Sequence, residues 1–206
     1  SVRISPRIGV RFNFPPRILS MKTCLIVIDA QESFRHRPYF TEHGLPDYLQ
    51  AQGALIAGAQ RIGLPIVRVL HVDEPADASN PFASESGHVR LLEGLHPFEA
   101  ALTIHKRRHS ALVGTGLDVW LTENGIGRII VSGVRTEQCC ETTARHASDL
   151  GWSVDYVTDA TLTWDMNQAD GSLLSPPNIK SPTATVLAGR FATVATVDEA
   201  LARAVA

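Results

Sequence analysis

Met21-Lys-Thr-Cys-Leu-Ile-Val-Ile-Asp29 is the stretch that decides the fold, because it is an apolar run that ends in an acid. Its core, Cys24–Ile28, is nearly continuous in aliphatic residues, which is typical of a strand covered on both faces. Similar short runs follow at Pro65–Leu70, Ala101–Ile104, Arg128–Val134, Ser153–Val157 and Ala192–Val197. Longer segments with apolar residues at helical spacing lie between them, at Leu45–Ile62, Leu117–Asn124 and Glu137–Leu150. This alternation predicts an α/β fold with a parallel sheet and helices on both of its faces.

Glycines and prolines predict where the helices stop and where loops lie. Gly63, Gly125 and Gly151 directly follow the three helical segments, as expected of C-terminal stops. We expect a polar loop at Asp73–Gly87, and a second loop at Ala169–Pro182, whose three prolines argue against regular structure. The second loop is long enough to cover a site.

The composition points to one globular domain. The chain has 206 residues, of which 44% are hydrophobic and 19% charged, with a formal net charge of −2. These values exclude a disordered chain and argue against a nucleic-acid partner, which would require a basic excess. No apolar run approaches the length that crosses a membrane, so we expect no membrane partner either. Three cysteines, two of them adjacent, make a poor disulfide framework, which favours a reducing, cytoplasmic location.

Residues 1–20 differ from the rest, because they contain four arginines and three prolines but no acid. We interpret them as an N-terminal extension that precedes a single domain at residues 21–206. A transit peptide is the alternative, although the prolines count against the amphipathic helix that such peptides need. A basic arm of this kind is compatible with contact to a neighbouring subunit, and hence with a homo-oligomer.

Polar residues follow several of the predicted strands. Asp29 ends the first strand, His71 and Asp73 follow the second, and Lys106 follows the third. The fourth strand runs into Gly133-Val-Arg-Thr-Glu-Gln-Cys-Cys140. Because ligands bind outside the carboxyl ends of parallel strands, an acid, a base and a thiol are expected to converge at this edge. Taken singly, Asp29 is equally consistent with a helix cap, and Lys106 with a solvated basic cluster.

The two adjacent cysteines are expected to face different ways. Cys140, Ala144 and Ala147 share one small-residue helix face, which suits close packing on the sheet, so Cys140 is predicted to be structural. Cys139 is rotated about 100° away from that face. A helix N-terminus and a nearby Lys106 would lower its pKa, so we predict that Cys139 is the reactive thiol. The alternative is a pair of buried, inert cysteines, and Cys24 is predicted to be core.

Four segments carry a resemblance to a known family. They are Leu25-Ile-Val-Ile-Asp29-Ala-Gln31-Glu-Ser-Phe34, then His105-Lys106-Arg-Arg-His-Ser110-Ala with Gly114-Thr115-Gly-Leu117, then Val131-Ser-Gly133-Val134-Arg135-Thr136-Glu-Gln-Cys139-Cys140-Glu141-Thr-Thr143-Ala144, and Asp159-Ala160-Thr161. From about Met21 onward the chain resembles the isochorismatase-like cysteine hydrolases. That family includes nicotinamidases, N-carbamoylsarcosine amidohydrolase and ureidoacrylate amidohydrolases.

The resemblance implies a three-layer, Rossmann-like fold with a six-stranded parallel sheet and a catalytic triad of Asp29, Lys106 and Cys139. It also implies a cis peptide between Val134 and Arg135, and an oxyanion hole made by the backbone N–H groups of Arg135 and Cys139. The implied reaction is hydrolysis of a C–N bond in a small amide, carbamoyl or ureido substrate through a thioester on Cys139. No cofactor is implied, and the implied assembly is a dimer or tetramer.

Departures from the family pattern limit the choice of substrate. Nicotinamidases carry an Asp-x-His metal motif after the second strand, whereas this chain has His71-Val-Asp73, the reverse order. Nicotinamidase activity is therefore disfavoured but kept as an alternative, and no metal is assigned. True isochorismatases cleave a vinyl ether and lack the nucleophilic cysteine, so this second alternative is also weaker. A non-catalytic redox sensor that uses Cys139 is the alternative from another class.

The pocket lining is predicted from loops at the same edge of the sheet. We assign Phe34, His71, Phe82 and Trp164 to it, with core packing of the aromatic side chains as the competing interpretation. Arg135 is expected either to reach a substrate carboxylate or to form a salt bridge between subunits.

Overall fold

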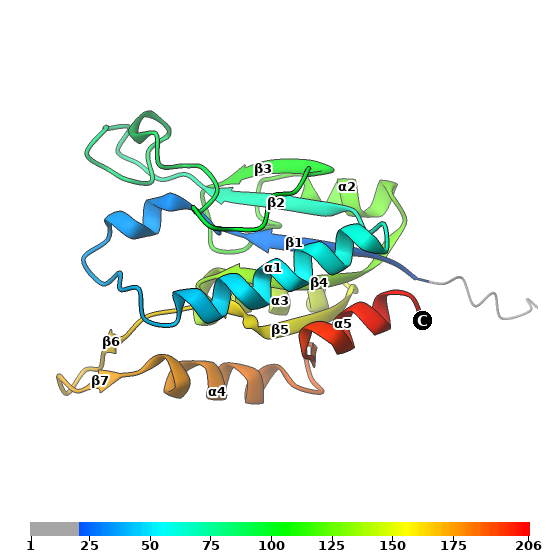
Figure 1. The fold of residues 1–206 in the computed structure, drawn as a ribbon. Coiled ribbons are helices and arrows are strands. Elements are labelled where there is room, and N and C mark those ends of the chain that lie inside the picture. Colours follow the sequence, from blue (N-terminus) through cyan, green and yellow to red (C-terminus); the bar gives the residue numbers. More distant parts are fainter. Residues whose placement is uncertain (1–20) are drawn as a thin grey trace, which may run out of the picture.

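The computed structural model describes residues 21–206, so the predicted extension at residues 1–20 lies outside the described part. Six strands form one parallel sheet in the order β3-β2-β1-β4-β5-β8. They are β1 (Lys22–Ile28), β2 (Ile66–His71), β3 (Leu102–Lys106), β4 (Ile126–Val134), β5 (Ser153–Leu162) and β8 (Thr193–Val194). Their carboxyl ends point to the same edge, on the left in Figure 1. The predicted six-stranded α/β sheet is confirmed.

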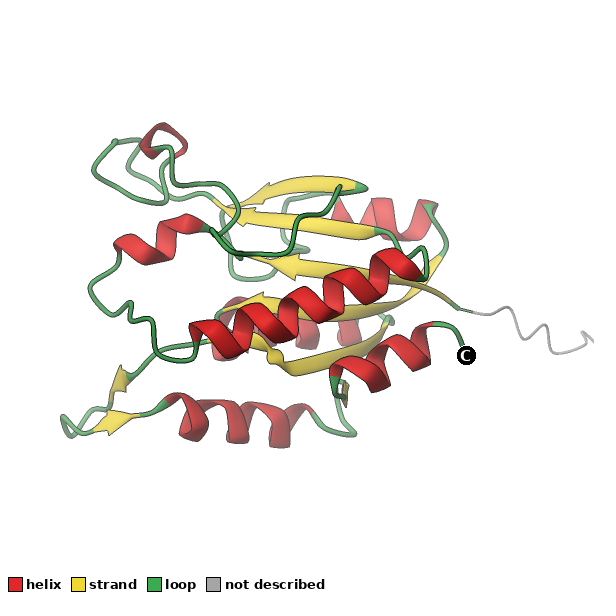
Figure 2. Ribbon diagram, viewed as in Figure 1, coloured by secondary structure: helices red, strands yellow, loops and turns green. Residues whose placement is uncertain are grey.

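Helices cover both faces of this sheet (Figure 2). The long helix α1 (Leu45–Arg61) and α5 (Val197–Ala204) pack on one face, and α2 (Leu117–Glu123) and α3 (Glu141–Asp149) on the other. Strand β1 divides its side chains between the two cores: Leu25 and Val27 join the core under α1, and Ile26 and Ile28 join the opposite one. This two-sided burial explains why β1 has no polar face.

The predicted loop at Ala169–Pro182 is wrong in its second half, because α4 spans Pro176–Leu187. A proline in the first helical turn removes an N–H that would lack a helical partner in any case, so Pro176 and Pro177 fit the start of the helix. Ile179, Thr183 and Leu187 form a buried stripe at helical spacing. We attribute the tolerance of Pro182 inside the helix to this packing. Before α4, β6 (Met166–Asn167) and β7 (Leu173–Leu174) form a small antiparallel hairpin.

Two other predicted elements differ in extent from those observed. The run Ala192–Val197 forms a strand only at Thr193–Val194, and α5 starts at Val197. A capping box in the sequence marks the start of α5. The Thr196 side chain accepts a hydrogen bond from the Glu199 N–H, and the Glu199 carboxylate accepts one from the Thr196 N–H. The predicted single helix at Glu137–Leu150 is split into a π-helical turn, η3 (Thr136–Cys140), and α3.

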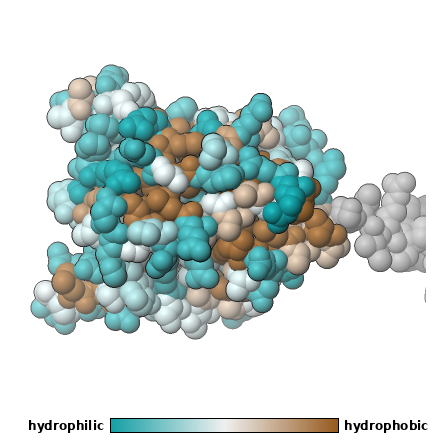
Figure 3. Space-filling model, in the orientation of Figure 1, coloured by the Kyte–Doolittle hydropathy of each residue, from teal (hydrophilic) through white to brown (hydrophobic). Residues whose placement is uncertain are grey.

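The opposite end of the sheet, where the described chain begins, carries exposed apolar residues (Figure 3). The side chains of Met21 and Val205 are 47% and 66% exposed there. Along with Trp120 and Ile126, both residues line a hollow of about 470 Å³. Among the described residues, no helix has the length and apolar character that crossing a membrane requires.

Candidate active site

The ends of β1, β2 and β3 bring the predicted polar residues together. Asp29 directly follows β1, with its N–H donating to the carbonyl of Val69 at 2.9 Å and with φ at +49°, a left-handed conformation that aspartate tolerates better than most residues. His71 and Lys106 lie opposite each other in the β2–β3 register. Gln31 fixes the end of β2, because its side-chain amide donates to the His71 carbonyl at 3.0 Å and accepts the His71 N–H at 2.7 Å.

The ammonium of Lys106 is the centre of the site. Its Nζ lies 2.8 Å from Asp29 Oδ2, 3.3 Å from Cys139 Sγ and 3.0 Å from His71 Nδ1. It also donates to the carbonyl of Arg108 at 3.0 Å. An ammonium has three protons, so these four neighbours share them. The Lys106 and Asp29 side chains are 0% and 1% exposed, which makes this a buried ion pair.

Cys139 reaches Lys106 from the π-helical turn η3. The Tyr156 hydroxyl donates to the carbonyl of Thr136 at 2.7 Å and so ties the start of this turn to β5. Cys140, which is fully buried, packs in the core beneath α3 with Ala144 and Ala147. The Cys139 sulfur instead accepts a hydrogen bond from Lys106. The two adjacent cysteines therefore have different surroundings.

The predicted lowering of the pKa of the Cys139 thiol is wrong for this site. Burial and, to a smaller extent, the Asp29 carboxylate together raise the pKa of Cys139 to about 12, because Lys106 opposes these two effects only in part. Although burial alone lowers the pKa of the Lys106 ammonium, Asp29 and Cys139 raise it above its usual value. The resting site therefore contains a neutral thiol beside a carboxylate–ammonium pair.

Three potential metal ligands converge here, since donor atoms of Asp29, His71 and Cys139 lie within 4.8 Å of one another. Lys106 Nζ lies no farther than 3.3 Å from an atom of each of them, so a positive charge already occupies the position between them. Asp73 is exposed, and its Oδ1 accepts the N–H of Glu74 at 2.8 Å. These residues do not fit a metal ion held by His71 and Asp73.

Gly133 lets β4 approach β1 closely just before the η3 turn that contains Cys139. Its φ is +125°, and a Cβ added to it would lie 1.9 Å from the carbonyl oxygen of Ile28, so only glycine fits there. One residue further on, the peptide bond between Val134 and Arg135 is cis. The chain then enters the η3 turn that carries Cys139.

The Arg135 side chain is engaged within the chain. Its Nε lies 3.1 Å from a carboxylate oxygen of Glu137 and donates to the Thr163 hydroxyl at 3.3 Å. Nη2 donates to the carbonyl of Trp164 at 3.3 Å, and the guanidinium carbon lies 4.8 Å from the centre of the Tyr39 ring. The guanidinium thus holds the Trp164 segment.

A cavity of about 120 Å³ leads to the cysteine. It is lined by Phe34, Arg37, Tyr39, His71, Asp73, Phe82, His109, Gln138 and Cys139. Of the predicted lining residues, Phe34, His71 and Phe82 lie on it. Trp164 is 2% exposed and supports Phe34 from behind, with 5.4 Å between ring centres. Four of the lining residues were not assigned from the sequence: Arg37, Tyr39, His109 and Gln138. Each lies within five positions of Phe34, Lys106 or Cys139 in the sequence, and this proximity could have indicated them.

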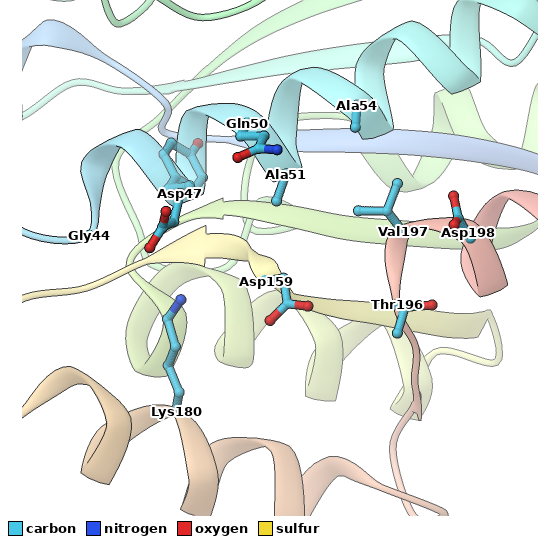
Figure 4. Close-up of a pocket in the computed structure, with 11 residues that line it drawn as sticks. Gly44, Asp47, Gln50, Ala51, Ala54, Asp159, Lys180, Thr196, Val197 and Asp198 are labelled. Atoms are coloured by element: carbon cyan, nitrogen blue, oxygen red, sulfur yellow. The ribbon is translucent and has the colours of Figure 1, made fainter.

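A larger cavity, of about 620 Å³, lies elsewhere in the described part of the chain and is lined by none of the three triad residues. Figure 4 shows Asp47 of α1, Asp159 of β5 and Lys180 of α4 at its wall. The Lys180 ammonium donates to the carbonyls of Thr158 and Thr161 at 3.4 and 2.6 Å, so it stabilises the end of β5. The candidate active site therefore does not lie in the more voluminous of these two cavities.

Comparison with known proteins agrees with the fold and with the family. The isochorismatase domain matches residues 23–196. YrdC of Bacillus subtilis, an uncharacterized isochorismatase family protein, is 24% identical over 179 residues, covering 86% of this chain and 94% of the relative. The structure of an isochorismatase from Pseudomonas putida is 31% identical with a TM-score of 0.74, covering 90% of this chain and 93% of that one.

An amidase is also among the similar structures. N-carbamoylsarcosine amidase from Thermoplasma acidophilum is 25% identical with a TM-score of 0.67, and the match covers 87% of this chain and 98% of that one. The domain match extends over most of the described residues and includes Asp29, Lys106 and Cys139. The chain therefore belongs to the isochorismatase family and is one of its cysteine hydrolases.

Proposed function

We propose that this protein hydrolyses the C–N bond of a small amide, carbamoyl or ureido compound through a thioester on Cys139. The observation that carries the proposal is the single buried cluster in which Lys106 Nζ contacts both Asp29 and the Cys139 sulfur. It holds a nucleophile, a proton acceptor and a cation, which are the three groups that this reaction needs.

In the first half of the reaction, Asp29 takes the proton of the Cys139 thiol as the sulfur attacks the substrate carbonyl. Asp29 has capacity for this proton, because Lys106 lies 2.8 Å from Oδ2 whereas Oδ1 accepts no hydrogen bond from the described residues. The C–S bond forms, and the C–N bond then breaks. Asp29 returns the proton to the departing nitrogen, so that ammonia or an amine leaves.

Two backbone N–H groups are available for the negative charge that develops on the carbonyl oxygen. The carbonyl of Arg135 accepts the N–H groups of Gln138 and Cys140, on either side of Cys139 in the chain. No hydrogen bond in the described part joins the N–H of Arg135 or of Cys139 to a group outside the η3 turn. We propose that these two donors form the oxyanion hole, an arrangement worth a factor of about 100 or more in rate.

In the second half, water attacks the thioester. Asp29 accepts one proton of this water, the acid product leaves, and the proton returns to the Cys139 sulfur. Across both halves, one amide and one water give one acid and one amine. Lys106 keeps its charge throughout and stabilises first the thiolate and then the carboxylate.

The redox-sensor alternative receives less support. A sensor needs an accessible thiol of low pKa with a resolving partner. Cys139 is only 7% exposed and its pKa is raised, while Cys140 is fully buried in the core.

The test is a panel of small amides, N-carbamoyl compounds and ureido compounds, assayed for released ammonia. Acid-quenched protein from the same reactions is mapped by mass spectrometry for an acyl group on Cys139. Cys139→Ala should abolish both signals, and Cys140→Ala, the matched control one residue away, should keep both. Turnover that persists in Cys139→Ala would refute the proposal.

The cytoplasmic location and the dimer or tetramer remain predictions. Light scattering of the purified protein at several concentrations measures the assembly state directly.

A further inference from the structure

The entrance of the active site contains an arginine that the proposed reaction does not use. Arg37 lines the same cavity of about 120 Å³ as Cys139, and its side chain is half-buried. The guanidinium carbon lies 4.8 Å from the centre of the Phe82 ring. This cation–π contact holds the guanidinium over the ring, and none of the hydrogen bonds found within residues 21–206 uses the N–H groups of the Arg37 side chain, so they can bind another partner.

Three other arginines at this edge of the sheet have carboxylate partners, and Arg90 and Arg108, which have none among the described residues, do not line the cavity. Arg35 pairs with Glu42 at 2.5 Å, Arg107 with Glu74 at 2.6 Å and Arg135 with Glu137 at 3.1 Å. Arg37 differs, because the ion pairs found within residues 21–206 include none for it. It is therefore a cation at the cavity wall without a fixed counter-ion from the described chain.

The remaining charges of the cavity do not replace that counter-ion. Asp29 and Lys106 neutralise each other deep in the site. Asp73 is the other acidic group on the cavity wall, but it is exposed and forms no ion pair with Arg37. The planar N–H edge of a guanidinium matches the two oxygens of a carboxylate, which it binds through paired, charge-assisted hydrogen bonds.

We propose that Arg37 is a specificity-determining residue that binds a carboxylate of the substrate. The substrate class is then narrowed to small amide, carbamoyl or ureido compounds that also carry a carboxylate. The small volume of the cavity requires that this carboxylate lie only a short distance from the carbonyl that Cys139 attacks. The inference rests on the proposed function, since it takes Cys139 as the reacting group.

Iodoacetate and iodoacetamide test this site without knowledge of the substrate. Both reagents alkylate thiols and have nearly the same size, but only iodoacetate carries a carboxylate. We measure the rates at Cys139 by peptide mapping at pH 8.5 and take the ratio of the iodoacetate rate to the iodoacetamide rate. Arg37→Met should lower this ratio about tenfold, the usual effect of losing one charge-assisted hydrogen bond. Arg37→Lys should lower it less.

Two further variants separate a specific site from general electrostatics. Arg107→Met removes an equal charge that is already paired with Glu74 and lies outside the cavity wall, so the ratio should stay near that of the natural protein. Asp73→Asn removes the negative charge of the same cavity and should raise the ratio. Equal ratios in Arg37→Met and Arg107→Met would overturn the carboxylate site and leave the proposed hydrolysis intact.

The remaining outcome affects both proposals. Should Cys139 react with neither reagent faster than the buried Cys24 and Cys140, it is not an accessible nucleophile. That result would count against the thioester reaction, and the carboxylate site would fall with it.

Discussion

Lys106 Nζ lies 3.0 Å from Nδ1 of His71, and this contact fixes the protonation state of the imidazole. An ammonium can only donate, so Nδ1 must accept and His71 is neutral, with its proton on Nε2. Burial lowers the pKa of His71, and the charge of Lys106 lowers it further. Asp29 and Asp73 oppose this shift, and His109 adds to it. Protonation of His71 would place two cations side by side in the centre of the site.

The first prediction concerns acid stability. Below its ordinary pKa of about 6.5, His71 takes up a proton in the unfolded chain but resists doing so in the folded one. The free energy of unfolding should therefore fall as the pH drops from 7 to 5. His71→Asn keeps an acceptor near the Nδ1 position but cannot be protonated, so its melting temperature should fall less over this range.

The control for that measurement is His43→Asn, because His43 is exposed in the loop before α1. Its melting temperature should follow that of the natural protein at each pH. A His71→Asn profile that runs parallel to the natural one would contradict the neutral state of this imidazole in the folded protein.

The second prediction is that Asp29 and Lys106 change the reactivity of Cys139 in opposite directions. With the pKa at about 12, the rate of alkylation by iodoacetamide should rise about tenfold per pH unit from pH 7 to 10 without a plateau. Asp29→Asn removes a negative charge that raises the pKa of Cys139, so alkylation should become about tenfold faster for each unit by which this pKa falls. The same variant should have no turnover. Lys106→Met should slow alkylation.

Mass spectrometry of the Cys139 peptide gives these rates, and circular dichroism checks that each variant is folded. Faster alkylation in a variant that no longer turns over would separate the role of Asp29 as proton acceptor from its effect on the resting thiol. A plateau below pH 8 in the natural protein would instead indicate a stable resting thiolate.

The third prediction tests the close approach of β4 to β1. Gly133→Ala would place a methyl group against the carbonyl of Ile28 at a φ that L-residues avoid, so it should lower the free energy of unfolding by about 3 kcal/mol or more. Urea denaturation measures the change. The control is Gly53→Ala in α1, where the new Cβ would meet the nearest side chain at 3.5 Å. It should be stabilising by up to about 1 kcal/mol. Equal effects would refute the steric argument.

Much of the fold follows from patterns that are local in the sequence. The runs at Cys24–Ile28 and Arg128–Val134 are buried on both faces and lie side by side as β1 and β4. Helix α4 was missed because its prolines resemble loop signals. The helix is stabilised by burial of Ile179 and by the packing of Leu187 in the core that includes Cys140 and Tyr156, which are distant in the chain.

The sequence by itself predicted which polar groups converge at the candidate site. Asp29 and Cys139 follow strands and Lys106 ends one, and the carboxyl ends of the strands of a parallel sheet share one edge, so their convergence at that edge could be predicted. The sequence could not determine the state of the thiol, because desolvation depends on every segment that covers the sulfur. Nor could the sequence show which of Arg37 and Arg135 has a guanidinium without a carboxylate partner in the described chain. Only the tertiary structure decided that Glu137 and Thr163 engage one guanidinium and that Phe82 holds the other at the cavity wall.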